Sequence, residues 1–323
     1  MDRRRFLLSS LAGVLAAPLG AEAQSPAARI GLLGPAEEPR FSEIASGLKQ
    51  GLREQGYRED RIHLVEGRTQ RGDAAGVRAT VQALVEQGVA VLFVVGSAPV
   101  RLARETAPQF PIVFITPGDP VGTGLVASLA RPGGNMTAMT FEYPELSGKR
   151  LELLRELAPR VRRVLTLYDS RDASPRQGAA AARAAATALD ITLVEREVRN
   201  ADEITRGLKG LDEVDGLLGI PGGVTSGHHE TMIAAANSKR LPSVFYTRTR
   251  STRDALLTYG ASDIDVAREA ARVVDKILKG ANAGDLPVER PTRLPLVINL
   301  RTAKALGLAI PPSLLARADQ VIE

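Results

Sequence analysis

Short apolar runs alternate with amphipathic helical segments along almost the whole chain. In helical segments such as 42–55, apolar residues recur every three to four positions, which places Ile44, Leu48 and Leu52 on one face. This alternation predicts an α/β fold built from doubly wound parallel sheets. The eleven strand-like runs are 28–34, 61–65, 90–95, 111–116, 135–141, 163–168, 192–198, 216–220, 242–246, 255–259 and 295–300.

Several of these runs are apolar on both faces, above all "VAVLFVVG" at 89–96. Parallel strands that helices cover on both sides need such sequences. Eleven strands are too many for one six-stranded unit, and 323 residues exceed one ordinary domain. We therefore expect two lobes, with three crossovers near 141–143, 259–263 and 288–291. The predicted N-terminal lobe is 29–141 plus 260–290, and the C-terminal lobe is 142–259 plus 291–323.

Residues 1–23 are predicted to be a signal peptide. The segment has a basic start, an apolar stretch at 6–19 and the small-x-small sequence Ala21-Glu22-Ala23 before the expected cleavage point. The run "RRRFL" at 3–7 resembles a twin-arginine export signal, and an arginine-rich ordinary secretory signal is the alternative. No later apolar run approaches the roughly 20 residues that span a membrane. We expect a soluble periplasmic protein after cleavage.

The composition excludes several kinds of site. Without cysteine, the chain has no disulfide, no thiolate metal site, no cysteine nucleophile and no attachment point for a lipid anchor. The three histidines, His63, His228 and His229, do not have the spacing of a metalloprotease site. No basic DNA-binding module precedes the first strand. We therefore predict no catalytic residue, no metal, no cofactor and no nucleic-acid partner.

In open α/β sheets, ligands bind beyond the carboxyl ends of the strands. Ser97 follows the third predicted strand, Asp119 follows the fourth within "TPGDP" at 116–120, and Gly222 follows the eighth. Small residues let a ligand approach backbone N–H groups, so these three positions are candidate ligand contacts. Ordinary turn and cap chemistry is the alternative, and Asp119 in particular can cap its own loop.

Tyrosines gather at the carboxyl ends of predicted strands. Four of the five, Tyr143, Tyr168, Tyr246 and Tyr259, lie there, although aromatic residues make up only 4% of the chain and tryptophan is absent. Tyrosine has an apolar face and a polar tip, which suits a cleft that closes on an organic ligand. Tyr168, Tyr246 and Tyr259 are therefore candidate ligand contacts, with simple core packing as the alternative.

Two long segments carry a resemblance to a known family. The segment 114–141, "FITPGDPVGTGLVASLARPGGNMTAMTF", and the C-terminal segment 267–323 resemble the TrpX-like family of ABC-transporter substrate-binding proteins. The resemblance implies a type I periplasmic-binding-protein fold, an ABC permease as partner and an aromatic amino acid as ligand. By this likeness, cleft-facing segments contain Ser97, Asp119, Tyr168, Tyr246 and Asp263. The chain departs from the family at Asp169-Ser170, where an Asn-Pro pair is usual, and at Asp254-Ala255, where Gly-Gly is common.

These observations predict a monomeric solute-binding protein of an ABC importer that closes two lobes around a small organic ligand. An amino acid or aromatic derivative is the expected ligand, a sugar is the competitor, and no catalysis is expected. One alternative is an exported NAD(P)-dependent oxidoreductase that uses Gly122-Thr123-Gly124 within a G-x-G-x-x-A pattern. Against it, Asp119 crowds the place of a pyrophosphate, and the motif follows the fourth strand. A sensor-linked binding protein is the other alternative.

Overall fold

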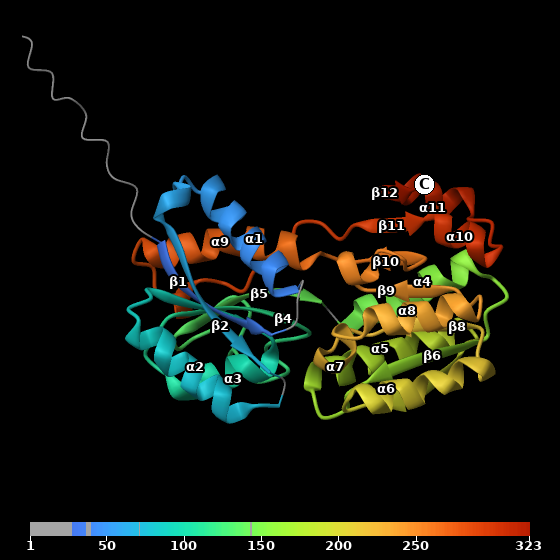
Figure 1. Ribbon diagram of the computed structural model, residues 1–323, viewed down its shortest axis with the longest axis horizontal. Coiled ribbons are helices and arrows are strands. Elements are labelled where there is room, and N and C mark those ends of the chain that lie inside the picture. The colour runs from blue at the N-terminus through green and yellow to red at the C-terminus, as the bar shows by residue number, and fades with distance from the viewer. Residues whose placement is uncertain (1–27, 37–39, 71, 143) are drawn as a thin grey trace, which may run out of the picture.

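Two β-sheets, each covered by helices on both faces, form two lobes of the protein (Figure 1). The computed structural model describes residues 28–36, 40–70, 72–142 and 144–323, so the predicted signal peptide lies outside the described residues. The predicted fold class, two doubly wound lobes joined by three crossovers, is confirmed. Within the described part of the chain, no helix is both long enough and apolar enough to cross a membrane.

The first sheet has five parallel strands in the order β2-β1-β3-β4-β5. Its strands are β1 (Ala28–Pro35), β2 (Ile62–Thr69), β3 (Val91–Val95), β4 (Ile112–Pro117) and β5 (Met136–Glu142). The helices between the first four strands are α1 (Arg40–Glu54), α2 (Ala74–Glu86) and α3 (Ser97–Thr106). All five residues of β3 are buried, as its doubly apolar sequence predicts.

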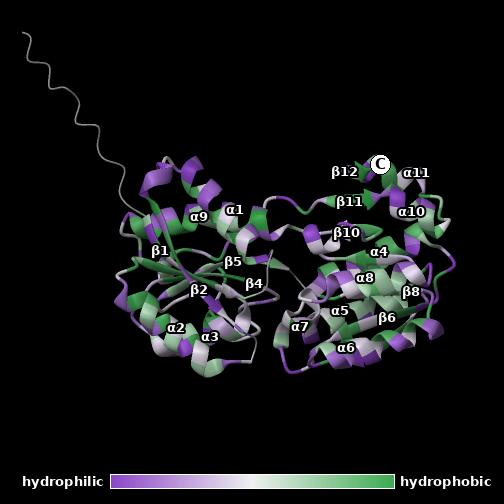
Figure 2. Ribbon diagram, in the orientation of Figure 1, coloured by the Kyte–Doolittle hydropathy of each residue, from purple (hydrophilic) through white to green (hydrophobic). Residues whose placement is uncertain are grey.

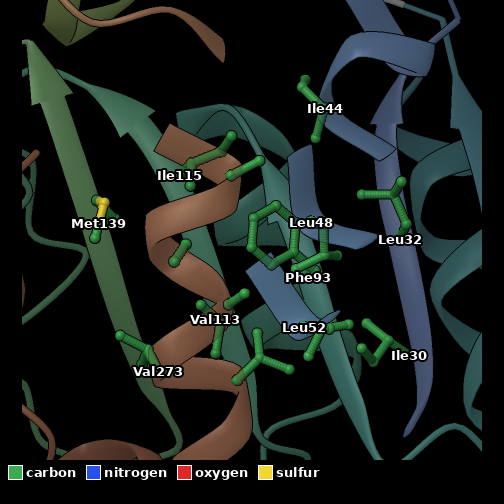
Figure 3. Packing of buried hydrophobic residues seen from close by; sticks show 14 of the residues in the cluster. Ile30, Leu32, Ile44, Leu48, Leu52, Phe93, Val113, Ile115, Met139 and Val273 are labelled. Carbon is green, nitrogen blue, oxygen red and sulfur yellow. The ribbon is translucent and has the colours of Figure 1, made fainter. Parts of the chain in front are cut away.

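Alternate residues of this sheet face two different cores. Phe93 and Val113 face α1 and the later helix α9 (Asp263–Leu278), together with Leu48 and Val273 (Figure 3). Their neighbours in the strands, Phe114 among them, pack with residues of α2 and α3 on the opposite face. The period-two alternation thus serves both helical layers at once.

The second sheet has seven strands in the order β12-β11-β10-β9-β8-β6-β7. The strands are β6 (Arg163–Tyr168), β7 (Thr192–Glu197), β8 (Gly216–Gly219), β9 (Ser243–Phe245), β10 (Leu257–Tyr259), β11 (Leu296–Asn299) and β12 (Gln320–Ile322). The helices are α4 (Pro144–Leu157), α5 (Ala173–Ala188), α6 (Ala201–Gly207), α7 (Gly223–Ser226), α8 (His229–Ser238), α10 (Leu300–Leu306) and α11 (Pro312–Arg317). Figure 2 shows mostly hydrophobic strands among helices that carry hydrophilic residues as well.

The second sheet differs from the sequence prediction at one edge. β11 runs antiparallel to β10, because the chain enters β11 as it returns from the first lobe. β12, which no apolar run predicted, pairs with β11 at the sheet edge. Two of its three residues are exposed, so the strand needs no apolar sequence.

The chain passes between the lobes at three places: between β5 and α4, between β10 and α9, and before β11. After the second passage, α9 packs against α1, and Glu289 then forms a bridge with Met139 of β5. These contacts support the lobe limits 29–141 plus 260–290 and 142–259 plus 291–323, which remain our proposal.

The contact between α1 and α9 depends on two glycines. A Cβ atom at Gly51 would lie 2.1 Å from the carbonyl oxygen of Arg268, and one at Gly47 would lie 2.3 Å from that of Ile264. Real Cβ atoms do not approach backbone oxygens so closely, so only glycine permits this spacing of the two helices. The segment that returns from the second lobe is therefore held against the first by backbone contact.

We expect Gly51→Ala to lower the free energy of unfolding by about 1–3 kcal/mol, because the new methyl group must push α9 away from α1. The midpoint of urea unfolding measures the loss. Gly210→Ala is the matched control, since its Cβ would meet no atom closer than 3.7 Å. Equal midpoints for the two variants would show that the helix contact tolerates the added group.

Candidate ligand-binding site

A pocket of about 180 Å³ lies where the two lobes meet. From the side of the first lobe, Arg40 and Glu43 of α1 and Asp263 of α9 line it. The second lobe contributes residues of α7, the start of α8 and the loop that follows β9, and in Figure 1 α7 lies at the end of this lobe that faces the first. These second-lobe residues are Ser226, Gly227, His228, His229, Glu230, Thr231, Tyr246, Thr247, Thr249 and Ser251.

An ion pair forms one wall of this pocket. Arg40 donates from Nε to Oδ2 of Asp263 at 2.8 Å, and from Nη1 to Oγ of Ser226 across the lobe boundary at 3.4 Å. Asp263 is only 5% exposed and lies in the first turn of α9, where the helix dipole favours a negative charge. The pair thus places a guanidinium and a carboxylate side by side in a small, partly desolvated pocket.

Glu43 lies on α1 three residues after Arg40 and also faces the pocket. Burial raises the pKa of its carboxyl group, the hydrogen bond from the backbone N–H of Arg250 lowers it, and the negative charge of Asp263 raises it again. The hydrogen bond joins Oε1 of Glu43 to the second-lobe loop at 3.3 Å. The carboxylate thus links the lobes at the cost of partial desolvation.

His229 and Tyr246 form an aromatic wall. The His229 ring stands edge-on to the rings of Tyr246 and Phe245, with centroids 5.1 and 5.3 Å apart. His229 is 3% exposed, and its Nε2 atom has no hydrogen-bond partner among the described residues. Burial above all, and then the charge of Arg40, lowers the pKa of His229 to about 3. The ring is therefore neutral at ordinary pH.

Of the seven predicted site residues, Tyr246 and Asp263 line the pocket. Ser97 and Asp119 lie at another contact between the lobes, against the start of α5. Ser174 donates from Oγ to the carbonyl of Pro117 at 2.6 Å, and lies 3.3 Å from Oγ of Ser97. The backbone N–H of Asp119 donates to Gln177 at 3.4 Å.

The Asp119 carboxylate caps its own loop in this structure. Its Oδ1 atom accepts a hydrogen bond from the backbone N–H of Val121 at 2.9 Å. The capping role considered from the sequence is therefore present, and the ligand contact of Asp119 stays a prediction.

The structure does not bring the other three predicted residues to the pocket. Tyr168 packs in the second-lobe core, where burial, followed by a hydrogen bond to Glu195, raises the pKa of its hydroxyl. The carbonyl of Tyr259 accepts a hydrogen bond from Nε of Arg150 at 2.7 Å, and the tyrosine packs against the same core. Gly222 precedes α7, and a Cβ there would lie 3.1 Å from Pro175.

Sequence reasoning missed Arg40, Glu43 and His229 as pocket residues. His229 follows the carboxyl end of β8, the edge where ligands bind, so its position was a usable signal. Arg40 and Glu43 follow β1 in the same way, but their proximity to Asp263 depends on the packing of α9 on α1.

The glycines at 122 and 124, on which the alternative oxidoreductase function depends, do not lie in the structure of a dinucleotide-binding loop. A dinucleotide fingerprint needs a helix to begin within its glycine loop. The fully described segment from Gly118 to Asn135 forms turns and bends without a helix. A Cβ at Gly122 would also lie 2.6 Å from Oδ2 of Asp119, so a carboxylate occupies the space beside this glycine. In the described ranges, no three histidine or acidic side chains are grouped to hold a metal ion.

His229 should make the protein sensitive to mild acid. In the unfolded chain a histidine has a pKa of about 6.5. Because the folded protein lowers this pKa, His229 contributes stability at pH values above about 6.5, and the contribution is lost as the pH falls below that value. Between pH 7 and 5.5 we expect the loss to be about 1 kcal/mol. His229→Phe should remove this loss, as measured by urea unfolding at both pH values. His63→Gln, which changes an exposed histidine, should keep it. An unchanged acid loss in His229→Phe would contradict the assignment.

Comparisons with known proteins find similar sequences and structures over most of the chain. A tyrosine-binding protein of Clostridioides difficile (strain R20291) is 21% identical over 280 residues, which cover 86% of this chain and 81% of the relative. The solved structure of an ABC domain in complex with L-Trp from Streptococcus pneumoniae is 25% identical with a TM-score of 0.80. The match covers 91% of this chain and 100% of that one.

A conserved domain protein from Vibrio cholerae has a similar structure, with 25% identity, a TM-score of 0.82 and coverage of 91% of this chain and 99% of that one. The model of the family described as ABC transporter substrate binding protein matches residues 29–322. This match spans almost all of the described residues, and the chain therefore belongs to the family of ABC transporter substrate binding proteins.

Proposed function

We propose that this protein is the periplasmic solute-binding component of an ABC importer, and that it binds an amino acid or a related aromatic compound. It would act as a monomer, without catalysis, and deliver the ligand to a membrane permease. The observation that carries the proposal is the pocket at the lobe boundary, which combines the Arg40–Asp263 ion pair with the Tyr246 and His229 rings.

An amino acid matches these groups in charge and shape. Its carboxylate pairs with a guanidinium such as that of Arg40, and its ammonium pairs with a carboxylate such as that of Asp263. An aromatic side chain would pack on the Tyr246 ring. The tyrosine-binding relative and the structure in complex with L-Trp support an aromatic amino acid as the ligand class.

Closure of the lobes would retain the ligand. Hydrogen bonds already join the lobes in this structure at Ser174–Pro117, Arg40–Ser226 and Arg250–Glu43. A ligand that binds between the lobes adds contacts only in the closed form, so it shifts the population toward closure. The closed form would then be the one that a permease recognises.

Ligand binding should therefore stabilise the whole protein. At a ligand concentration one hundred times its dissociation constant, we expect about 2.7 kcal/mol of stabilisation, which raises the melting temperature. The measurement is a thermal-shift panel of amino acids, aromatic acids and sugars at millimolar concentration. Tyrosine and tryptophan should give the largest shifts. A clear shift with sugars and none with amino acids or aromatic compounds would contradict the proposed ligand class.

Ser174→Ala should weaken ligand binding through lobe closure alone. The variant removes the hydrogen bond to the Pro117 carbonyl, a bond worth about 1 kcal/mol, and the longer contact with Ser97, so affinity should fall at least about fivefold. Calorimetry measures the affinity, and small-angle scattering should show a larger radius of gyration without ligand.

Ser170→Ala is the matched control for this experiment. Ser170 donates to Glu197 at 2.6 Å within the second lobe, and no hydrogen bond joins its side chain to a described residue of the first lobe. Its affinity should equal that of the wild type. If both variants bind ligand as tightly as the wild type, the Ser174 contact does not contribute to closure.

A further inference from the structure

The pocket contains more carboxylates than arginine or lysine side chains. Among the described residues, Glu43, Glu230 and Asp263 line it, whereas Arg40 is the one arginine or lysine in the lining. His229 adds no positive charge, because its buried ring stays neutral. In a partly desolvated space, this imbalance favours a positively charged ligand.

Arg40 is already occupied by protein groups. Its Nε donates to Asp263 at 2.8 Å and its Nη1 to Ser226 at 3.4 Å. A ligand carboxylate would have to compete with the Asp263 carboxylate for this guanidinium, and the displaced Asp263 would then need a cation of its own. Arg40 therefore offers little to an anionic ligand that brings no positive charge.

The surroundings of the Glu43 carboxylate differ from those of the Arg40 guanidinium. In the described part of the chain its carboxylate has no ion-pair partner, and one backbone N–H, that of Arg250 at 3.3 Å, donates to it. Burial and the neighbouring Asp263 disfavour its charged form, and the charges of Arg250 and Arg40 favour it, each with a smaller effect than that of Asp263. A cation placed beside Glu43 would relieve both costs.

We propose that the ligand's ammonium group, bound beside Glu43 and Asp263, is the charge that this pocket selects, and that a ligand carboxylate is dispensable. The pocket then takes organic amines that carry an aromatic body, as well as amino acids. This inference rests on the pocket assigned under the proposed function, and it narrows the ligand class to compounds with a cationic head.

Three compounds with the same ring separate the contributions of the two charged groups. L-Tyrosine carries both charges, tyramine carries the ammonium alone, and 3-(4-hydroxyphenyl)propionate carries the carboxylate alone. Calorimetry at pH 7.5 with the mature full-length protein measures each affinity. We expect tyramine to bind within about tenfold of tyrosine, and the propionate at least a hundredfold more weakly than tyramine. L-Tryptophan, tryptamine and indole-3-propionate repeat the comparison with a larger ring.

Glu43→Gln tests the assigned carboxylate. Glutamine keeps the oxygen that accepts from Arg250, so lobe closure is preserved while the charge is lost. We expect tyramine affinity to fall at least tenfold. Glu86→Gln is the matched control, because Glu86 ends α2 of the same lobe with an exposed side chain and is not among the described residues that line the pocket. Its effect should stay below threefold, and an equal loss in both variants would overturn the role of Glu43.

The outcomes separate this inference from the proposed function. If tyrosine binds but tyramine does not, or if the propionate binds as tightly as tyramine, the ammonium inference is wrong and the amino-acid proposal stands. If tyramine binds and no amino acid does, the amino-acid proposal is wrong and the ammonium inference stands. If no compound of either series binds, both are overturned.

Discussion

The contact between α1 and α9 is the constraint on which the pocket depends. Helix α9 comes after the second lobe in the chain, yet it packs on the first helix of the first lobe, with Gly47 and Gly51 removing the side chains that would hold the backbones apart. This contact brings Asp263 to Arg40, although 223 positions separate them in the sequence. The charged wall of the pocket therefore forms only when the returning segment is docked.

Desolvation explains the rest of the pocket's chemistry. The described lining of the pocket holds one arginine, three carboxylates and a buried imidazole, and burial shifts the pKa of Glu43 and that of His229. It lowers the pKa of His229, which keeps the ring neutral, and it raises that of Glu43, which makes a nearby cation favourable. Hydroxyl groups of the second lobe complete the lining without adding charge.

The sequence predicted the fold well because the fold depends on local patterns. Doubly apolar runs such as β3 mark strands that are covered on both faces, whereas no apolar run predicted the exposed edge strand β12. The lining of the candidate pocket was predicted less well, and which residues contact a ligand stays a prediction. Tyr246 and Asp263 follow strand ends and line the pocket, whereas Tyr168 also ends a strand but points into the core toward Glu195. Position along a strand fixes the edge of the sheet but not the direction of a side chain.

The aromatic wall is joined directly to the second crossover. Oγ1 of Thr247 donates to the carbonyl of Ala261 at 3.0 Å, and a Cβ at Gly260 would lie 2.0 Å from the carbonyl oxygen of Tyr246. Gly260 has a φ of 148°, a conformation that glycine alone adopts easily. The fully buried Arg150 donates to the carbonyl of Tyr259. Its Cζ atom lies 5.9 Å from the centroid of the Tyr246 ring. A rotation of the backbone at Gly260 would therefore also move Tyr246 and Thr247 in the pocket wall. This couples the shape of the pocket to the angle between the lobes.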